Sequence, residues 1–287
     1  MRVAMIESMR AHGALLRRLV LMLWLSWLAV PALAQPGPRE AFDHSHAAWQ
    51  ALLARHVVVL DGGRATRVRY RGFAAERAQL QQYLGSVSAV PRADYQQWSR
   101  AQRLAFLINA YNAFTVEKVL SRYPDLKSMR DFGRVFGNPW KDRFFTLFGA
   151  PQHLDGIEHE TIRAPGAFDD PRIHFAVNCA AIGCPALREE AYTAAKLEQQ
   201  LEEQTARFLS DRRRNRHVAG ALEVSQIFEW YGRDFASGQR GIHSLQQFLG
   251  QHAQLLADRD EDRQAIRSGR LPIRFLEYDW ALNDTGG

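Results

Sequence analysis

The sequence predicts an α+β fold, in which helices pack on a small mixed or antiparallel sheet within a single compact domain. Amphipathic helical patterns recur along the chain, and short β-type runs with glycine turns stand between them, as at 57–70. Of the 287 residues, 46% are apolar and 24% charged, which is ordinary globular composition. We find no internal repeat and no linker, so we expect one domain over residues 42–283.

The first half of this domain is predicted to be mainly helical. The strongest helical segment follows Pro91: Ser99 is a plausible N-cap, the apolar arc is wide, and the helix should end before Tyr123-Pro124. Before it, the patterns predict a helix over 42–55, a hairpin with strands 57–60 and 67–70, and a helix over 73–86.

The second half alternates short strands and helices. Asp155 and Glu158 have the spacing of a capping box, which predicts a short helix over 155–163. The apolar run 172–178 indicates a short buried strand, followed by a turn-rich stretch, 179–185. Before these segments, the patterns predict a strand over 144–148. After them, the patterns predict helices over 193–211, 226–233, 244–255 and 259–267, a hairpin over 217–224 and a strand over 273–278.

The amino-terminal segment resembles a signal peptide. Arg17 and Arg18 precede the apolar run 19–30, and an A-x-A pattern ends at Ala34. This run of twelve residues, apolar except for Ser26, is too short to span a bilayer core of roughly 30 Å. We therefore expect a signal peptide over 1–34, a flexible leader over 35–41, and a periplasmic or secreted protein that leaves the membrane after cleavage; an uncleaved anchor is the alternative.

Charge and motifs exclude several function classes. The formal net charge is +6, and the predicted signal peptide contributes +3 of it, so the bias is too weak to indicate nucleic-acid binding. A glycine-rich phosphate loop, a G-x-S-x-G elbow and an H-E-x-x-H motif are all absent from the sequence. We expect no cofactor, and as partner a small molecule, a peptide or a component of the cell envelope.

Cys179 and Cys184, the only cysteines in the sequence, lie five residues apart around Gly183. In an exported protein, one interpretation is a disulfide that closes a small loop. Such a bond would shape the loop more than it would stabilise the fold, because a short loop removes little entropy from the unfolded chain.

The alternative interpretation is a reactive thiol. Proline suits the first position of a helix, which would place Cys184 at an N-cap where backbone N–H groups favour a thiolate. If the strand 172–178 continues through Cys179, alternation points Cys179 away from His174, which favours Cys184 as the partner of His174. Cys184 would then attack, His174 would accept its proton, and Asn178 or Glu158 would orient the imidazole.

Other polar residues could bind a ligand near this stretch. Asn109 and Asn112 lie on the apolar central helix, on either side of Tyr111, and buried amides need partners: either the loop 179–185 or a ligand. His159 adjoins Glu158. Histidines and glutamates of this region could in principle hold zinc, but their spacing matches no strong pattern, and we assign no metal ligand.

Four blocks of the sequence resemble the domain-of-unknown-function family 547 (DUF547). They occur in order over about 100–235, and Tyr278-Asp279-Trp280 is also similar to the family. The blocks are FLINAYNAF (106–114), LDGIEHETIR (154–163), DPRIHFAVNCAAIGCPAL (170–187) and SQIFEWYGRDF (225–235). The resemblance implies a bacterial exported or envelope protein, and it assigns no catalytic residues.

Two main hypotheses follow for function. One is a thiol-dependent hydrolase or acyltransferase built on Cys184 and His174. The other is a non-enzymatic binding protein in which a Cys179–Cys184 disulfide shapes the recognition loop. Metal binding through His, Glu and Cys is a third alternative. The sequence does not decide whether the protein is an enzyme.

Overall fold

The computed structural model describes residues 41–133 and 137–286. The predicted signal peptide and the leader up to residue 40 lie outside the described residues. From Phe42 onward the chain forms one compact unit. Among the described residues, we find no helix that is both long enough and apolar enough to cross a membrane.

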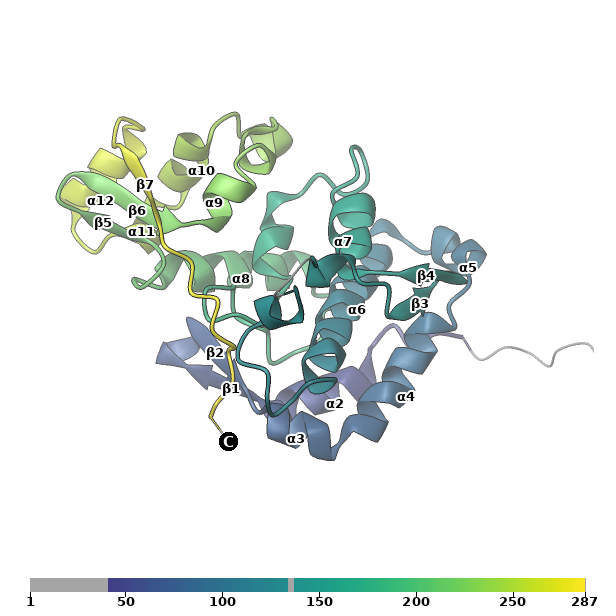
Figure 1. Cartoon of the computed structure of the whole chain (residues 1–287). Helices are drawn as coiled ribbons and strands as arrows, with labels where there is room; N and C mark the ends of the chain where they lie inside the picture. Colours follow the sequence, from purple (N-terminus) through teal and green to yellow (C-terminus); the bar gives the residue numbers. More distant parts are fainter. Residues whose placement is uncertain (1–40, 134–136, 287) are drawn as a thin grey trace, which may run out of the picture. The chain divides into compact units, whose positions relative to one another are not determined.

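Helix α6 (Arg100–Leu120) is the centre of the larger hydrophobic core. Ser99 caps it in a reciprocal capping box with Gln102, and the helix ends before Tyr123, so both predicted boundaries are confirmed. Helices α3 and α4 pack against α6, and α2 packs against α3 and α4 (Figure 1). The helices that precede α6 are Ala47–His56 (α2), Tyr70–Ala75 (α3), Arg77–Ser88 (α4) and Arg92–Gln97 (α5).

The strands form three small sheets. Strands β1 (Val57–Leu60) and β2 (Ala65–Val68) pair antiparallel, as do β3 (Phe145–Leu147) and β4 (Ala150–Gln152). In the third sheet, β6 (Ala221–Ser225) pairs antiparallel with β5 (Arg216–Val218) and parallel with β7 (Ile273–Leu276). Helices with small antiparallel and mixed sheets confirm the predicted α+β class.

A second hydrophobic cluster lies beside the three-stranded sheet. The rings of Phe208 and Phe235 each pack there against both Phe175 and Phe228, with ring centres 5.0 to 6.1 Å apart. The helices of this part are α8 (Leu197–Ser210), α9 (Ile227–Trp230), α10 (Leu245–Gln251), α11 (Ala253–Leu256) and α12 (Asp260–Arg267).

Two local predictions about the segments that carry the candidate site residues are wrong. Residues 172–178 do not form a strand: Pro171–Phe175 is a 3₁₀ helix, η5, because Pro171 suits a first helical position and the Asp170 carboxylate accepts a hydrogen bond from the Arg172 N–H. No helix begins at Cys184-Pro185, which lie in irregular structure. The expected N-cap position of Cys184, and the helical N–H groups it would supply, are therefore absent.

The predicted helix 155–163 is present but differs in form. Helix α7 (Leu154–Ile157) continues into a π-helical turn, η4 (Glu158–Ile162). The N-cap is His153 rather than Asp155, because the imidazole Nδ1 of His153 accepts a hydrogen bond from the Gly156 N–H at 2.8 Å. π-helical turns are rare and often occur at functional sites.

Candidate functional site

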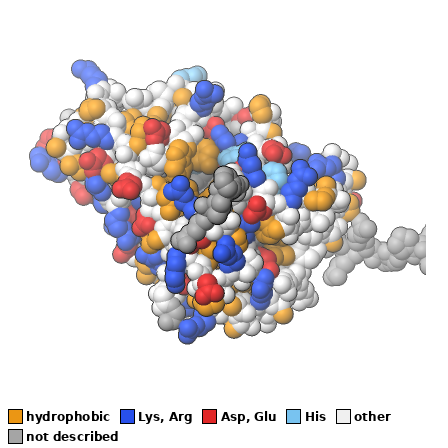
Figure 2. All heavy atoms as spheres, in the orientation of Figure 1, with side chains coloured by type: hydrophobic (Ala, Val, Ile, Leu, Met, Phe, Trp, Pro, Cys, Tyr) orange, Lys and Arg blue, Asp and Glu red, His pale blue; other side chains and the backbone are white. Residues whose placement is uncertain are grey.

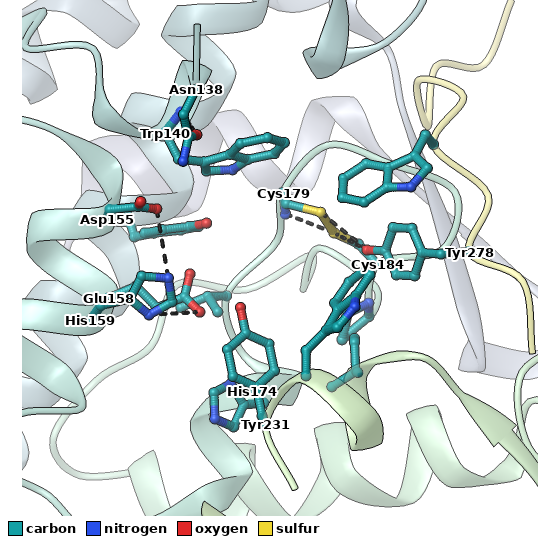
Figure 3. Close-up of a pocket in the computed structure, with 16 residues that line it drawn as sticks. Asn138, Trp140, Asp155, Glu158, His159, His174, Cys179, Cys184, Tyr231 and Tyr278 are labelled. Atoms are coloured by element: carbon teal, nitrogen blue, oxygen red, sulfur yellow. Dashed lines mark hydrogen bonds and ion pairs between the residues drawn. A yellow bond between two sulfur atoms is a disulfide. The ribbon is translucent and has the colours of Figure 1, made fainter. Parts of the chain in front are cut away.

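A cavity of about 340 Å³ lies where η4, the 177–185 loop, α9 and the C-terminal segment after β7 meet. In the close-up, the disulfide and Tyr278 lie on one side of this pocket, and Asp155, Glu158 and His159 lie on the opposite side (Figure 3). We call these the sulfur side and the acidic side. In the space-filling view, hydrophobic side chains gather near the centre of the face shown (Figure 2).

Cys179 and Cys184 form a disulfide, with an S–S distance of 2.03 Å and Cα atoms 6.1 Å apart. Of the two interpretations left open by the sequence, this structure contains the disulfide, and the described residues include no free cysteine. The Cys184 Sγ accepts hydrogen bonds from the Cys179 N–H at 2.9 Å and from the Tyr278 hydroxyl at 3.1 Å. Cys184 is buried, whereas Cys179 is half-buried.

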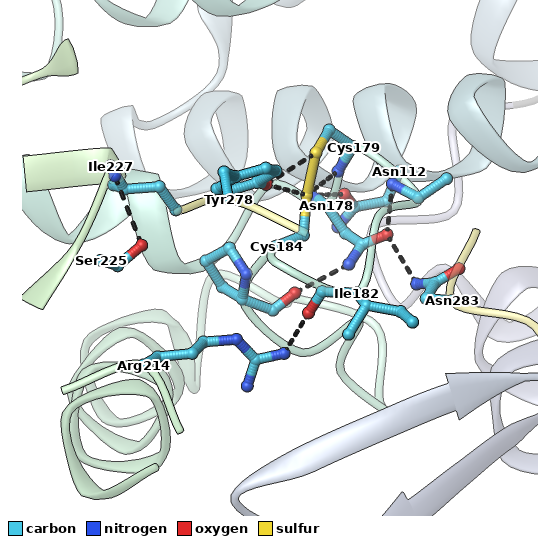
Figure 4. Close-up of a disulfide and its surroundings, with 12 residues drawn as sticks. Asn112, Asn178, Cys179, Ile182, Cys184, Arg214, Ser225, Ile227, Tyr278 and Asn283 are labelled. Atoms are coloured by element: carbon cyan, nitrogen blue, oxygen red, sulfur yellow. Dashed lines mark hydrogen bonds between the residues drawn. A yellow bond between two sulfur atoms is a disulfide. The ribbon is translucent and has the colours of Figure 1, made fainter. Parts of the chain in front are cut away.

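Asn178 holds the disulfide loop from within. Its Nδ2 donates to the carbonyl of Pro185 at 2.7 Å, and its Oδ1 accepts from the Ala180 N–H at 2.9 Å. The same Oδ1 accepts from Asn283, and Asn112 Oδ1 accepts from the Asn178 N–H (Figure 4). Asn178 is therefore occupied by buried structural hydrogen bonds.

Asn109 and Asn112 bind main chain rather than lining the pocket. Asn109 donates to the Tyr192 carbonyl and accepts from its N–H, while Asn112 also donates to the carbonyl of Ala176. Both amides are buried and satisfied. Tyr111, between them on α6, lines the pocket, as do His159 and Cys179.

His174 lies on η5 and lines the pocket with its ring stacked on Tyr231, centres 3.9 Å apart. Burial lowers the pKa of His174, although its hydrogen bond to Asp234 acts in the opposite direction. Because a carboxylate only accepts, His174 donates from Nε2 to Asp234 Oδ2 at 2.7 Å. Asp234 also pairs with Arg163, and these two hydrogen bonds lower its pKa despite the opposing effect of burial.

The acidic side is built by the turn from α7 into η4. Glu158 is 5% exposed, and its carboxylate interacts with the hydroxyls of Tyr111 and Tyr231. Burial first, and then this carboxylate, raise the pKa of both tyrosines. Burial and the nearby Glu158 raise the pKa of Asp155, whereas His159, with Nε2 3.6 Å from the Asp155 carboxylate, acts to lower it.

Aromatic rings connect the two sides. Trp280 is the centre of this aromatic wall: its ring lies 4.6 Å from Tyr278, 5.6 Å from Trp230 and 5.9 Å from Trp140. The side chains of these tryptophans line the pocket. Within the described part of the chain, no lysine or arginine lines it.

Sequence reasoning missed Asp234 and the three tryptophans. Asp234 stands in the block 225–235, but only a known fold shows that it reaches His174. The structure itself marks Trp230 as a candidate, because a large aromatic side chain that is 45% exposed suggests a contact surface. The sequence does not reveal this exposure.

Chemically, this arrangement can surround a small molecule with aromatic faces, offer it two carboxylates and place it beside a disulfide. The described residues include no group of three or more His, Cys, Asp or Glu side chains placed to hold a metal ion.

Comparison with curated proteins found no match, and comparison with solved structures found none either. A family model described as "Protein of unknown function, DUF547" matches residues 95–209. This segment contains α6, η4 and the disulfide loop, and so includes residues from both sides of the pocket. On this match, the segment 95–209 belongs to the DUF547 family.

Proposed function

We propose that this protein is a binding protein of the periplasm or the cell exterior, and that its pocket takes a small organic cation. The disulfide shapes the recognition loop and is the kind of bond that persists in an oxidising compartment. The structure does not favour a thiol-dependent hydrolase or acyltransferase, because the Cys184 Sγ is bonded to Cys179 and no helix begins at Cys184-Pro185.

One observation carries the proposal: two carboxylates face a wall of tryptophan rings, and no lining lysine or arginine of the described residues neutralises them. Cations outside the lining are engaged elsewhere or lie over rings: Arg163 is held by Asp234 and lies over the ring of Tyr231, and Arg130 lies over the ring of Trp280. Aromatic faces attract cations through their quadrupoles, most strongly in a desolvated site. Carboxylates at the same site add Coulombic attraction. A positively charged ligand therefore satisfies both features at once.

The test compares choline with 3,3-dimethyl-1-butanol, a neutral compound of the same shape. Binding is measured by tryptophan fluorescence and calorimetry on residues 35–287, the chain expected after signal-peptide cleavage. We expect choline to bind at least about tenfold more tightly than the neutral isostere, a difference of about 1.4 kcal/mol.

Matched variants locate the effect. Glu158→Gln should weaken choline binding about tenfold, because it removes the buried pocket charge. Glu160→Gln is the control, since Glu160 lies on the same turn with its side chain 67% exposed and does not line the pocket; it should change the affinity less than about twofold. Equal affinities for choline and the isostere, or no choline binding up to about 10 mM, would overturn the proposal.

A further inference from the structure

We propose that the Cys179–Cys184 disulfide is a thiol–disulfide exchange site, and that its substrate is a small thiol carrying an ammonium group. This goes beyond ligand binding, and it rests on the proposed cation preference only for the choice of thiol. The exchange itself follows from how the two sulfurs are placed.

The two sulfurs are not equivalent. The Tyr278 hydroxyl lies close to both, 3.1 Å from Cys184 Sγ and 3.2 Å from Cys179 Sγ, but Cys184 Sγ also accepts a second hydrogen bond, from the Cys179 N–H at 2.9 Å. Such donors stabilise negative charge on sulfur, and a sulfur that bears negative charge more easily is the better leaving group. Cys184 is only 3% exposed, whereas Cys179 is half-buried at the pocket surface. Cys179 is therefore the sulfur to be attacked, and Cys184 the one to leave.

Hydrogen bonds hold the loop in addition to the S–S bond. The Ile182 N–H donates to the Ala281 carbonyl and the Gly183 N–H to Asp279, both at 2.8 Å. Asn178 ties Pro185 to Ala180 across the loop (Figure 4). A reduced pair of thiols would thus stay close enough to be oxidised again, which an exchange site requires.

The reaction consists of two successive displacements at sulfur. The incoming thiolate attacks Cys179 Sγ, a new S–S bond forms, and the electron pair of the old bond goes to Cys184 Sγ, which takes up the proton that the incoming thiol released. A second molecule of thiol then attacks the sulfur of the bound thiol, forms a small-molecule disulfide and releases Cys179. Two thiols are oxidised, and the protein disulfide is reduced to two thiols; the reverse reaction reoxidises the protein.

The acidic side selects among thiols by charge. Glu158 and Asp155 face the disulfide across the pocket, so an anionic thiol is repelled from it and an ammonium-bearing thiol is attracted. An aminothiol places its ammonium group toward the carboxylates and the aromatic wall, with its sulfur toward Cys179. This orientation connects the two sides of the pocket in one substrate.

The experiment uses cysteamine, 2-mercaptoethanol and 3-mercaptopropionate, which are similar in size and carry positive, zero and negative charge. Reduction of the folded protein is followed by acid quench, alkylation and mass spectrometry. Each rate is divided by the rate of the same thiol with 2-hydroxyethyl disulfide, which corrects for intrinsic reactivity. We expect the normalised rate of cysteamine to exceed that of 3-mercaptopropionate at least about tenfold.

The trapped intermediate tests the site. We expect the mixed disulfide to map to Cys179 and not to Cys184. Tyr278→Phe removes one of the two donors to the leaving sulfur and should slow reduction about threefold to tenfold, whereas Tyr123→Phe, which loses a hydroxyl bond to Asp284 elsewhere, should not.

The outcomes separate this inference from the proposed function. Adducts at Cys184, or reduction that occurs only at the unfolding rate whatever the thiol, would overturn the exchange site even if choline binds. Adducts at Cys179 with equal normalised rates for all three thiols would support the exchange site and overturn the choice of an aminothiol. Choline binding is measured without any thiol, so its failure is recorded independently.

Discussion

The two sides of the pocket are held by different kinds of bonds. On the sulfur side, the loop is fixed by main-chain and amide hydrogen bonds, chiefly those of Asn178. On the acidic side, a rare π-helical turn presents a carboxylate and an imidazole, Glu158 and His159, whose partners are other side chains. The difference indicates that the sulfur side sets a fixed position, while the acidic side sets charge and responds to pH.

Both sides are completed by residues outside the segment that matches the family. Trp230, Tyr231 and Asp234 come from α9 and the turns after it, while Tyr278 and Trp280 come from the C-terminal segment. The Asn283 N–H donates to the Ala180 carbonyl, which docks this segment on the disulfide loop. The matched segment 95–209 therefore does not contain the whole candidate site.

The largest expected effect comes from breaking the sulfur side at Asn178. Asn178→Ala leaves the buried Pro185 carbonyl and the Ala180 N–H without partners. Each unsatisfied buried group costs about 1–3 kcal/mol, so we expect the free energy of unfolding to fall by about 3 kcal/mol or more. Urea unfolding with the disulfide intact measures this, with Asn138→Ala, at the exposed cap of η3 (Pro139–Lys141), as the control. A loss below about 1 kcal/mol would contradict the role of the amide.

Removing the disulfide should have a smaller effect. The bond closes a loop of only a few residues, so Cys179→Ala with Cys184→Ala should cost about 2 kcal/mol, mainly through the unfolded state. We expect a native circular dichroism spectrum and retained choline binding. If this double variant were less stable than Asn178→Ala, the S–S bond rather than the hydrogen bonds of Asn178 would be the main support of the loop. The description of the sulfur side as fixed by hydrogen bonds would then be wrong.

Much of the fold was predictable from local patterns. The long apolar arc and the Ser99 cap of α6 identify the central helix, and glycine turns identify the hairpins β1–β2 and β5–β6. The segment 172–178 was misassigned because its apolar content is typical of a strand, whereas the preceding Asp170-Pro171 cap starts a 3₁₀ helix. The parallel pairing of β6 with β7 joins residues about 50 positions apart, which no local pattern encodes.

The candidate site was predictable only in part. The disulfide was one of two interpretations, and Glu158, His159, His174 and Tyr111 were singled out and line the pocket. Asp234 could not be assigned as the partner of His174, because 60 residues separate them. The tryptophans of the aromatic wall were missed for the same reason, because they come from three distant segments. In addition, a single tryptophan in a sequence is more often a core residue.

The smallest expected effect is the pH dependence of choline affinity, which tests the acidic side. Burial and Glu158 raise the pKa of Asp155, so this carboxyl takes up a proton at a higher pH than an ordinary aspartate. Its other charged or titratable neighbours are His153, His159 and Lys141. Choline keeps its charge at every pH, and only the ionised carboxylate attracts it. Choline affinity should therefore fall, by about threefold, as the pH drops through the raised pKa of Asp155.

Fluorescence titrations with choline between about pH 4 and pH 8 measure this slope. Asp155→Asn should bind choline more weakly at neutral pH and should lose most of the slope, because the carboxyl that titrates is gone. His159→Gln separates the two neighbours, since it removes the imidazole and leaves the carboxyl in place. A slope that persists in Asp155→Asn but disappears in His159→Gln would assign the pH response to the imidazole, and the acidic side would then respond to pH through His159 rather than through its carboxylates.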